Sequence, residues 1–391
     1  MLNDKYMFKN KWTDICRDMC ENSSYEDLQA PYAVTVQNAT ILPQKAGDTP
    51  WGIGGCLDSN GNIVKESLLN GAFGGKYEYN KNDIKDLVDE TVIFIPIIPN
   101  HWGHFLVDVV SRLWILFDDR YYSPETKILF CGWRWSEGKI TGKCKEFFEL
   151  CGVKEENLIM VDKPIKVREV LIPSTTFKFS EYYNSFYKVP IQKVISSIIN
   201  SNYGEGKEKY KKIYFSRTQL KETKKREIGE DIIEKFFEEN GYKILYPENL
   251  TLKEHIFYIN NADFFAGLSG TTMHNMVFGR ANSTVLILNR TAYPCDPQIS
   301  FNRLFNEINS FFIDVYDKRT QKRPRNYGSG PFLIGVNENL LRYADDMKMD
   351  VNKSDLQGRN HLMKFYCLSL YYSFIRNKLI IKLYRSLRKK A

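Results

Sequence analysis

The sequence predicts an α/β protein made of two Rossmann-like halves that face a cleft. Its 391 residues exceed what one hydrophobic core usually organises, and 43% of them are apolar, which is enough to fill two cores. Apolar runs alternate with amphipathic segments in two series, which is the pattern of βαβ units around parallel sheets. A polar segment at 201–211 separates the series and is interpreted as a linker. We therefore expect domains at 1–200 and 212–330, followed by a helical tail at 331–391.

The first series follows short β-like runs at 32–36 and 40–42, which are broken by glycine and asparagine. The glycine clusters at 51–55 and 71–75 lack the spacing of a phosphate-binding loop, so we interpret both as turns. Beyond residue 91 the alternation predicts buried strands and intervening helices. The strands are expected at 91–98, 127–130, 157–161 and 169–172, and the helices near 103–117 and 142–151.

The second series repeats this pattern after the linker. Strands are expected at 212–215, 242–246, 263–266 and 284–288, and helices at 228–240, 251–261 and 271–278. Ligands of doubly wound sheets bind beyond the carboxyl ends of the strands. Polar residues that directly follow these strands are therefore the first candidates for a functional site.

The tail from about residue 360 has a different pattern. Apolar side chains recur at steps of three and four, and cations follow the same period on a neighbouring stripe, so a basic amphipathic helix is expected. The apolar stripe comprises Phe365, Leu368, Tyr372, Ile375, Leu379, Leu383 and Leu387, and the basic stripe Lys378, Lys382, Arg385 and Lys389. One interpretation is attachment of 365–391 to an anionic membrane surface, where each cation adds about 1 kcal/mol. The other is a closing helix that packs across the domains, and the two are compatible.

The charge distribution argues against nucleic acid as a partner. The formal net charge is +8, and seven cations with no acid lie in the last sixteen residues, so the rest of the chain is almost neutral. A nucleic-acid-binding protein should instead spread basic residues over its binding face. These cations are Arg376, Lys378, Lys382, Arg385, Arg388, Lys389 and Lys390.

The expected location is the cytoplasm, at the inner face of the cell membrane. No uncharged apolar stretch of 18 residues occurs, and the N-terminus lacks the apolar core of a secretory signal. The eight cysteines are scattered without a C-x-x-C pair, which favours reduced thiols over a zinc site. Neither a metal nor another cofactor is expected.

The first candidate site directly follows the strand expected to end at Ile98. His104, Asp108 and Arg112 are spaced at i, i+4 and i+8 and share one helical face. A carboxylate or a histidine in that position can remove the proton of a substrate hydroxyl. The structural alternative is that Asp108 pairs with Arg112 while His104 caps or packs.

The second candidate is the glycine-rich turn at 266–275, between a strand and a helix. Backbone N–H groups at the start of a helix can hold a pyrophosphate, and Ser269, Thr271 and Thr272 would add donors. Many helices nevertheless begin with such residues as an ordinary N-cap.

The third candidate is Arg217, which follows the strand at 212–215. Arginine binds phosphate in a bidentate manner, so Arg217 together with Lys225 or Arg226 could neutralise a leaving nucleoside diphosphate. A charged surface loop is the alternative, and for 221–225 we prefer it.

Five segments in this order resemble glycosyltransferase family 61 over about 100–288, roughly half of the chain. They are the His-Phe-Leu-x-Asp helix at 104–108, the Ser-Arg pair at 216–217, Arg-x-Ile-x-Glu at 226–230, the segment 246–255 and the Gly-x-x-Gly-x-x-x-x-Asn loop at 267–275. The resemblance implies a GT-B fold, inversion at the anomeric carbon, nucleotide-sugar donors and no obligatory metal. Bacterial members are usually capsular polysaccharide biosynthesis proteins. The lack of an Asp-x-Asp motif agrees with metal independence.

Carried over by position, the resemblance makes Asp108 the base, with His104 beside it. It assigns the domain 1–200 to the acceptor and the domain 212–330 to the donor, most simply a UDP-sugar. The acceptor would be an oligo- or polysaccharide, including a lipid-linked one. The donor-binding residues would be Arg217, Arg226, Glu254, Gly267, Ser269, Gly270, Thr271, Thr272, His274 and Asn275.

The chain departs from the family pattern at Leu268-Ser269, where a Pro-His pair is common, and at Gly229-Glu230, where Asn-Glu is usual. These departures affect the expected donor contacts more than the fold. Two other functions stay open: a non-catalytic, membrane-docked scaffold of a polysaccharide assembly complex, and a pyruvyl or phosphosugar transferase of similar fold. The joint presence of His104, Asp108 and Arg217 argues against the scaffold.

Overall fold

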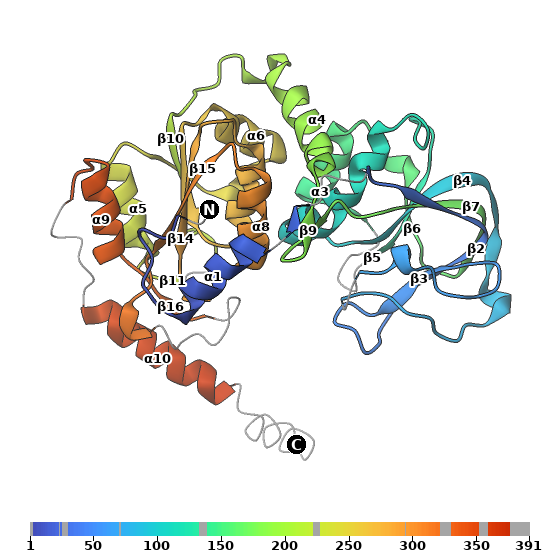
Figure 1. Ribbon diagram of the computed structural model, residues 1–391, viewed down its shortest axis with the longest axis horizontal. Helices are drawn as coiled ribbons and strands as arrows, with labels where there is room; N and C mark the ends of the chain where they lie inside the picture. The colour runs from blue at the N-terminus through green and yellow to red at the C-terminus, as the bar shows by residue number, and fades with distance from the viewer. Residues whose placement is uncertain are drawn as a thin grey trace. The chain divides into compact units, whose positions relative to one another are not determined.

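The protein is described here by a computed structural model in which the chain forms two compact units (Figure 1). The N-terminal unit comprises 22–207 and 251–260, and the C-terminal unit comprises 1–21, 208–250 and 261–391. The structure describes residues 3–22, 24–25, 30–69, 72–132, 139–221, 227–293, 295–320, 330–351 and 359–375. The mixed α/β fold with parallel sheets is confirmed.

The N-terminal unit is built on a six-stranded sheet with the order β3-β2-β7-β4-β5-β6. Strands β7, β4, β5 and β6 are parallel, whereas β2 runs antiparallel to β3 and β7. Ile93 pairs with Ile128 on one side and with Leu171 on the other, which places it in the centre of the core. The bounds are β2 Ala33–Lys45, β3 Ile53–Leu57, β4 Lys85–Ile98, β5 Ile128–Gly132, β6 Leu158–Met160 and β7 Ile165–Pro173.

The region before β4 is more regular than its glycine content predicts. The runs expected at 32–36 and 40–42 form one continuous strand, β2, and residues 53–55 of the first glycine cluster form part of β3 rather than a turn. The expected turn holds at Gly52, whose φ is +86° and where a Cβ would lie 2.2 Å from the Lys45 carbonyl oxygen, and at Ala72 of the second cluster, whose N–H donates to the Leu69 carbonyl at 3.0 Å. Gly71 of the second cluster lies outside the described residues.

The helices of the N-terminal unit carry its first candidate site. The expected helix at 103–117 consists of three consecutive pieces: a short α-turn, α2 (Trp102–His104), a π-helical turn, η3 (Phe105–Val109), and a 3-10 segment, η4 (Val110–Phe117). The other helices are α3 (Gly142–Leu150), α4 (Lys188–Ile199) and α6 (Leu252–Asn261). A small sheet joins β1 (Ser24–Tyr25), β9 (Tyr182–Tyr183) and β8 (Phe177–Lys178).

The C-terminal unit contains a five-stranded, fully parallel sheet with the order β12-β10-β13-β14-β15. Helices α5 and α9 cover one face of this sheet, and α8 covers the other (Figure 1). The strands are β10 (Lys212–Phe215), β12 (Lys243–Leu245), β13 (Phe264–Leu268), β14 (Thr284–Asn289) and β15 (Asn309–Asp314). The helices are α5 (Glu230–Glu239), α7 (Thr271–His274) with η9 (Asn275–Phe278), α8 (Asp296–Leu304) and α9 (Glu338–Asp346).

Side chains on α5 show why this series was predictable. Ile233, Phe236 and Phe237 are spaced at three and four residues, and all three are buried against the sheet. The ring of Phe237 stacks on Tyr214 of β10 with centroids 4.9 Å apart. Each side chain of this size contributes roughly 1.5–3 kcal/mol through burial, so the face that packs is set by the helical period.

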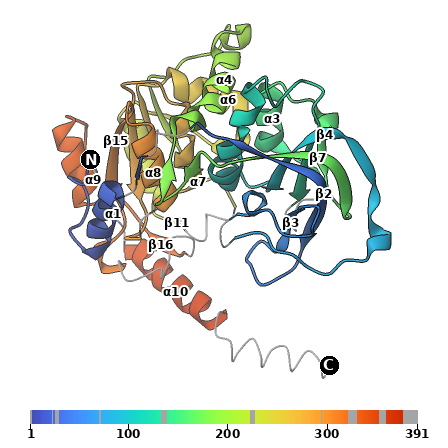
Figure 2. The ribbon, with the colours of Figure 1, turned by 45° about the vertical axis from the view of Figure 1, so that its right-hand side comes forward.

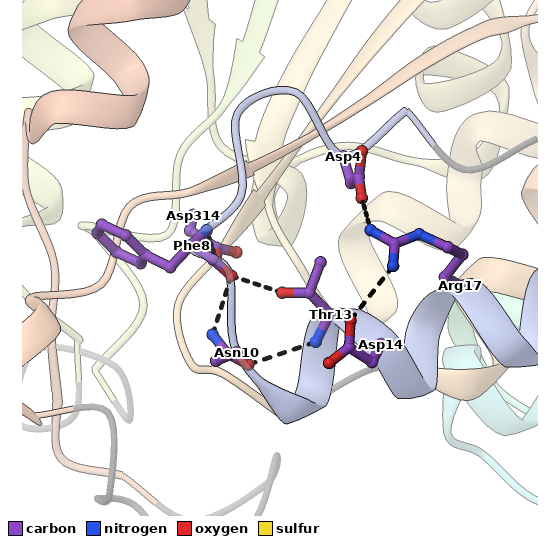
Figure 3. Close-up of polar contacts among 7 residues, drawn as sticks. All are labelled: Asp4, Phe8, Asn10, Thr13, Asp14, Arg17 and Asp314. Atoms are coloured by element: carbon purple, nitrogen blue, oxygen red, sulfur yellow. Dashed lines mark hydrogen bonds and ion pairs between the residues drawn. The ribbon is translucent and has the colours of Figure 1, made fainter.

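The first 21 residues, expected in the N-terminal domain, lie in the C-terminal unit. Tyr6 pairs with Ile313 beside β15, and the Phe8 backbone N–H donates to the buried Asp314 carboxylate at 2.8 Å (Figure 3). The side chain of Asn10 accepts from the Trp12 N–H at 2.8 Å and so starts α1 (Lys11–Asn22). Burial of Tyr6 and Phe8 decides this placement, which no periodicity within the segment predicts.

The end of the described chain is α10 (Arg359–Ile375), which packs beside the two-stranded sheet of β11 (Glu227–Ile228) and β16 (Phe332–Leu333) (Figure 2). Phe365 is buried there against Ile228 and Leu333. The basic residues from Arg376 to Lys390, on which the predicted basic helix depends, lie outside the described residues. Within the described ranges, no helix is long and apolar enough to cross a membrane.

Short 3-10 turns complete the described secondary structure. They are η1 (Lys65–Ser67), η2 (Lys81–Asp83), η5 (Glu155–Asn157), η6 (Ser185–Tyr187), η7 (Asn202–Gly204), η8 (Pro247–Asn249) and η10 (Lys318–Thr320). The chain passes from one unit to the other between Lys207 and Glu208, inside the segment interpreted as a linker.

Candidate active site

The first group of candidate residues lies on the helix that follows β4. His104 and Asp108 are close together, with the His104 Nδ1 3.2 Å from the Asp108 Oδ2. Asp108 lies in the π-helical turn η3, a local widening of a helix that occurs frequently at functional sites. The rings of Trp51 and His104 are nearly perpendicular, with centroids 4.6 Å apart. The structure thus brings the two predicted catalytic residues into one polar pair.

This pair has the composition of a proton-transfer group. An Nδ1–H that donates to the carboxylate leaves the Nε2 of His104 as an acceptor, and the same contact orients the carboxylate. The His104 side chain is 41% exposed and that of Asp108 is 20% exposed, so a substrate hydroxyl can reach them. Either residue can therefore accept a proton while the other holds it in place.

Arg112 does not take the role of ion-pair partner that the structural alternative assigned to it. Its guanidinium donates to the backbone carbonyls of Glu66 at 2.9 Å, Leu68 at 3.1 Å and Pro173 at 2.5 Å. Burial lowers the pKa of Arg112 to about 10. The side chain connects η1, its C-cap Leu68 and the end of β7 to the helix, and thereby supports the segment on which Asp108 lies.

A pocket of about 660 Å³ opens inside the N-terminal unit at this segment, a volume typical of small-molecule sites. Its lining combines aromatic rings with charged groups of both signs. Besides His104 and Asp108, the lining includes Trp51, Lys65, Lys178 and Tyr182. Segments from 32 to 182 meet here, which is why sequence reasoning missed every lining residue except those on the helix itself.

The second group lies at the carboxyl edge of the parallel sheet in the C-terminal unit. Arg217 follows β10, the glycine-rich turn follows β13, and Arg290 follows β14. These strands are neighbours in the sheet, with Phe215 paired to Gly267 and Leu268 paired to Leu288. Three segments of the chain therefore converge at the edge where ligands of such sheets bind.

The two arginines share one carboxylate. Glu227 Oε1 accepts from the Arg217 Nη1 at 3.0 Å and also from Arg290. The Glu227 side chain is 1% exposed, and the guanidinium of Arg290 also lies over the Phe332 ring, 4.5 Å from its centroid. Two cations around one anion leave a net positive charge, which favours an anionic ligand.

Glu230 lies beside this cluster without adding a full negative charge. Its Oε1 accepts from the Arg217 backbone N–H at 2.9 Å and from the Tyr214 hydroxyl at 3.4 Å. Burial, with the nearby charge of Glu227, raises the pKa of Glu230 to about 8. Burial therefore favours the neutral form of this carboxyl beside the arginines.

The glycine-rich turn is held partly by the contacts of its own residues. Gly270 has a φ of +141° and starts α7, while the Ser269 N–H donates to the Leu288 carbonyl at 2.8 Å and is used by the sheet. A Cβ at Gly267 would lie 3.2 Å from the Phe215 carbonyl oxygen, so a larger residue would disturb the contact between β10 and β13. Thr271 and Thr272, both half-buried, form the first turn of α7, where N–H groups lack acceptors within the helix.

His274 and Asn275 hold this turn in place. The Nδ1 of His274 lies 3.0 Å from the Gln298 Oε1 on α8, and the side chain of Asn275 donates to the Thr272 carbonyl at 2.9 Å. Both residues are buried. The structure thus places them beneath the turn, among its supporting contacts.

Two further predicted donor residues fall elsewhere. Glu254 lies in the N-terminal unit, where its carboxylate accepts from the backbone and hydroxyl of Thr251 and caps α6. Arg226 lies outside the described residues. Arg290 and Glu227, which sequence reasoning did not select, are the additional charged residues of the cluster. The position of Arg290, directly after an apolar strand, is the signal that could have indicated it.

Among the described side chains, no group of three or more His, Cys, Asp or Glu residues is arranged to hold a metal ion. The described residues therefore contain an arginine–glutamate cluster at the sheet edge of the C-terminal unit and a histidine–aspartate pair on the helix after β4 of the N-terminal unit.

A comparison of the sequence with protein-family models finds a match. The family model described as Glycosyltransferase 61 matches residues 102–286, slightly less than half of the chain. The match begins at α2, includes His104, Asp108, Arg217 and the glycine-rich turn, and ends within β14. It supports the family that the ordered motifs resemble, and with it a glycosyltransferase that uses a sugar donor and an acceptor. No curated protein shows significant similarity to this chain.

Proposed function

We propose that this protein is an inverting, metal-independent glycosyltransferase of the GT-B type that transfers a sugar from a UDP-sugar to a capsular or other cell-surface polysaccharide in a bacterium. The observation that carries the proposal is the convergence of Arg217, Arg290 and the glycine-rich turn at the carboxyl ends of three adjacent parallel strands. Two guanidinium groups and a helix start suit the diphosphate of a nucleotide sugar.

In this proposal the C-terminal unit binds the donor. The diphosphate carries more negative charge than the single Glu227 carboxylate, so it attracts both guanidinium groups without a bridging metal. Charge on the diphosphate grows as the bond to the sugar breaks. Arginines that are already held by Glu227 stabilise that charge with little reorganisation.

The N-terminal unit binds the acceptor in the pocket beside His104 and Asp108. Asp108, oriented by His104, removes the proton of the acceptor hydroxyl. The hydroxyl oxygen then attacks the anomeric carbon from the side opposite to the diphosphate. The new carbon–oxygen bond forms as the bond to the diphosphate breaks, and this single displacement inverts the anomeric configuration.

The proposal is tested with a panel of UDP-, GDP- and CMP-sugars, following thermal stabilisation and release of the nucleotide. One class of donor should stabilise the wild-type protein, and Arg217→Ala should lose the stabilisation. Lys235→Ala, which removes an exposed cation of α5 in the same unit, is the matched control. If no nucleotide or nucleotide sugar stabilises the wild-type protein, the proposed function is wrong.

A further inference from the structure

Helix α10 has apolar side chains on two opposite sides. The inner side carries Leu362, Phe365 and Leu368, which pack against Ile228 and Leu333. The outer side carries four large apolar side chains that are exposed, which we call the outer face of α10. They are Met363 (65% exposed), Tyr366 (46%), Leu370 (69%) and Tyr371 (58%).

The spacing of the outer face makes it one continuous stripe. Residues three, four or eight positions apart lie on the same side of a helix. Tyr366 follows Met363 by three positions, Leu370 follows Tyr366 by four, and Tyr371 follows Met363 by eight. The sequence of α10 contains one arginine, Arg359, and one lysine, Lys364, but no acidic residue. Helix α5, in contrast, has acidic residues and lysine outside its buried face, as is usual for a solvated helix. The outer face therefore has the composition of a binding surface and not that of an ordinary solvent-exposed surface.

The sequence that follows α10 indicates what covers this face. Residues 376–391 contain seven lysines and arginines and no acid, whereas the rest of the chain has a net charge close to zero. An apolar stripe that is followed in the sequence by many cations matches a bilayer surface that contains anionic lipids, because apolar groups enter the acyl boundary and cations attract the headgroups. The two tyrosines suit that boundary, since each has an apolar ring and a polar hydroxyl.

We propose that the outer face of α10 docks this protein on a lipid bilayer while the inner face keeps the helix on the C-terminal unit, and the basic sequence that follows α10 is the reason for inferring that the bilayer is anionic. The sequence assigned the stripe containing Phe365 and Leu368 to the lipid. The structure shows that Phe365 is 1% exposed, so the residues that would enter the lipid are on the opposite side of the helix. The inference is independent of the proposed glycosyl transfer.

The test measures binding of the full-length protein to phosphatidylcholine vesicles with and without 30 mol% phosphatidylglycerol, roughly the range in which anionic charge recruits polybasic segments. The wild-type protein should sediment only with the anionic vesicles, and salt should weaken the binding. Met363→Asn/Leu370→Asn should weaken binding roughly tenfold or more, since two apolar groups are lost from the lipid contact. Leu87→Asn, at an exposed leucine of β4, is the matched control and should bind like the wild type.

A second variant addresses the cations, with Arg385, Arg388, Lys389 and Lys390 all changed to Gln. It should lose the preference for anionic vesicles but keep the thermal stability of the wild type. Equal vesicle binding by Met363→Asn/Leu370→Asn and wild type would overturn the proposal. A dimer in light scattering that the same double variant dissociates would also overturn it, because the outer face would then bind a second copy of the chain. Donor stabilisation in both variants should equal that of the wild type, so failure of this inference is distinguishable from failure of the proposed function.

Discussion

The His104–Asp108 pair and the arginine–Glu227 cluster differ in how far their charged side chains are exposed to solvent. In the N-terminal unit, His104 and Asp108 have side chains that are 41% and 20% exposed. In the C-terminal unit, Glu227 is 1% exposed and its two arginine partners are 10% and 21% exposed. A base must reach a substrate and exchange a proton, which requires access. A group that stabilises a leaving diphosphate works best when it is held in a fixed position and shielded from water. The comparison predicts that changes in the first group affect turnover, and that changes in the second affect binding and stability.

The largest effect is expected for Asp108→Asn. Loss of the base should lower the rate of sugar transfer by roughly 10²- to 10⁴-fold. Stabilisation by the donor should persist, because the arginine cluster is intact. Asp118→Asn, at a half-buried aspartate paired with Arg120, is the control and should keep full activity. Full activity of Asp108→Asn would remove this residue from the mechanism.

Replacing Glu227 with Gln tests the second group. Breaking a buried ion pair by neutralising one partner costs about 3 kcal/mol, because two guanidinium groups lose their shared carboxylate. Chemical denaturation should show this loss of stability in Glu227→Gln, and a diphosphate should restore part of it by supplying negative charge to the arginines. Glu239→Gln, at the end of α5, should change the stability by less than about 0.5 kcal/mol. Unchanged stability of Glu227→Gln would contradict the proposed burial of this pair.

Arg290→Lys and Arg217→Lys compare the two arginines with each other. Lysine keeps the charge but loses the planar fork, so donor affinity should fall roughly tenfold in each variant. The larger loss is expected for Arg290→Lys, since Arg290 also packs on the Phe332 ring. Isothermal titration calorimetry, with the donor that the nucleotide-sugar panel identifies, measures the donor affinity of both variants. Unchanged affinity in both variants would show that the cluster serves the fold and not the donor.

Titration of Glu230 should make the stability of the folded protein depend on pH. Its pKa is about 8 in the folded protein, above the ordinary value of 4.5, so the folded state binds the proton more tightly than the unfolded state. Between pH 4.5 and 8 this group therefore lowers the stability as the pH rises, by up to about 1.4 kcal/mol per pH unit, and its effect is constant above pH 8. Glu230→Gln should flatten the decline of the melting temperature between pH 5.5 and 8. An unchanged decline would show that the carboxyl titrates as in water.

The second series of strands and helices, from β10 to β14, was the most predictable part of the fold. The expected strand at 212–215 coincides with β10, and the helix at 251–261 differs from α6 by one residue. Apolar periodicity is strong there because each element buries one side or both. Helix α4 was not predicted, although Ile191, Val194 and Ile198 form its buried stripe, because its β-branched residues and Pro190 resemble a strand or a loop.

Among the candidate residues, the contacts between near neighbours in the sequence were predictable, and the contacts between distant residues were not. His104 and Asp108 could be paired from the sequence, because i and i+4 on a helix are neighbours by geometry. Arg217 and the glycine-rich turn could be placed at strand ends. Glu227, which accepts from both Arg217 and Arg290, could not be identified, since its contact with Arg290 joins residues 63 positions apart.

The sequence by itself determined the α/β class, the second series of strands and the local pair of possible catalytic residues, because these depend on periods of two and four residues along the chain. Tertiary structure alone decided that the first 21 residues join the C-terminal unit, that Arg112 binds backbone carbonyls, and that Phe365 faces inward. Those outcomes depend on which distant surfaces exclude water and which buried polar groups they leave to be satisfied. Local patterns carry no information on either.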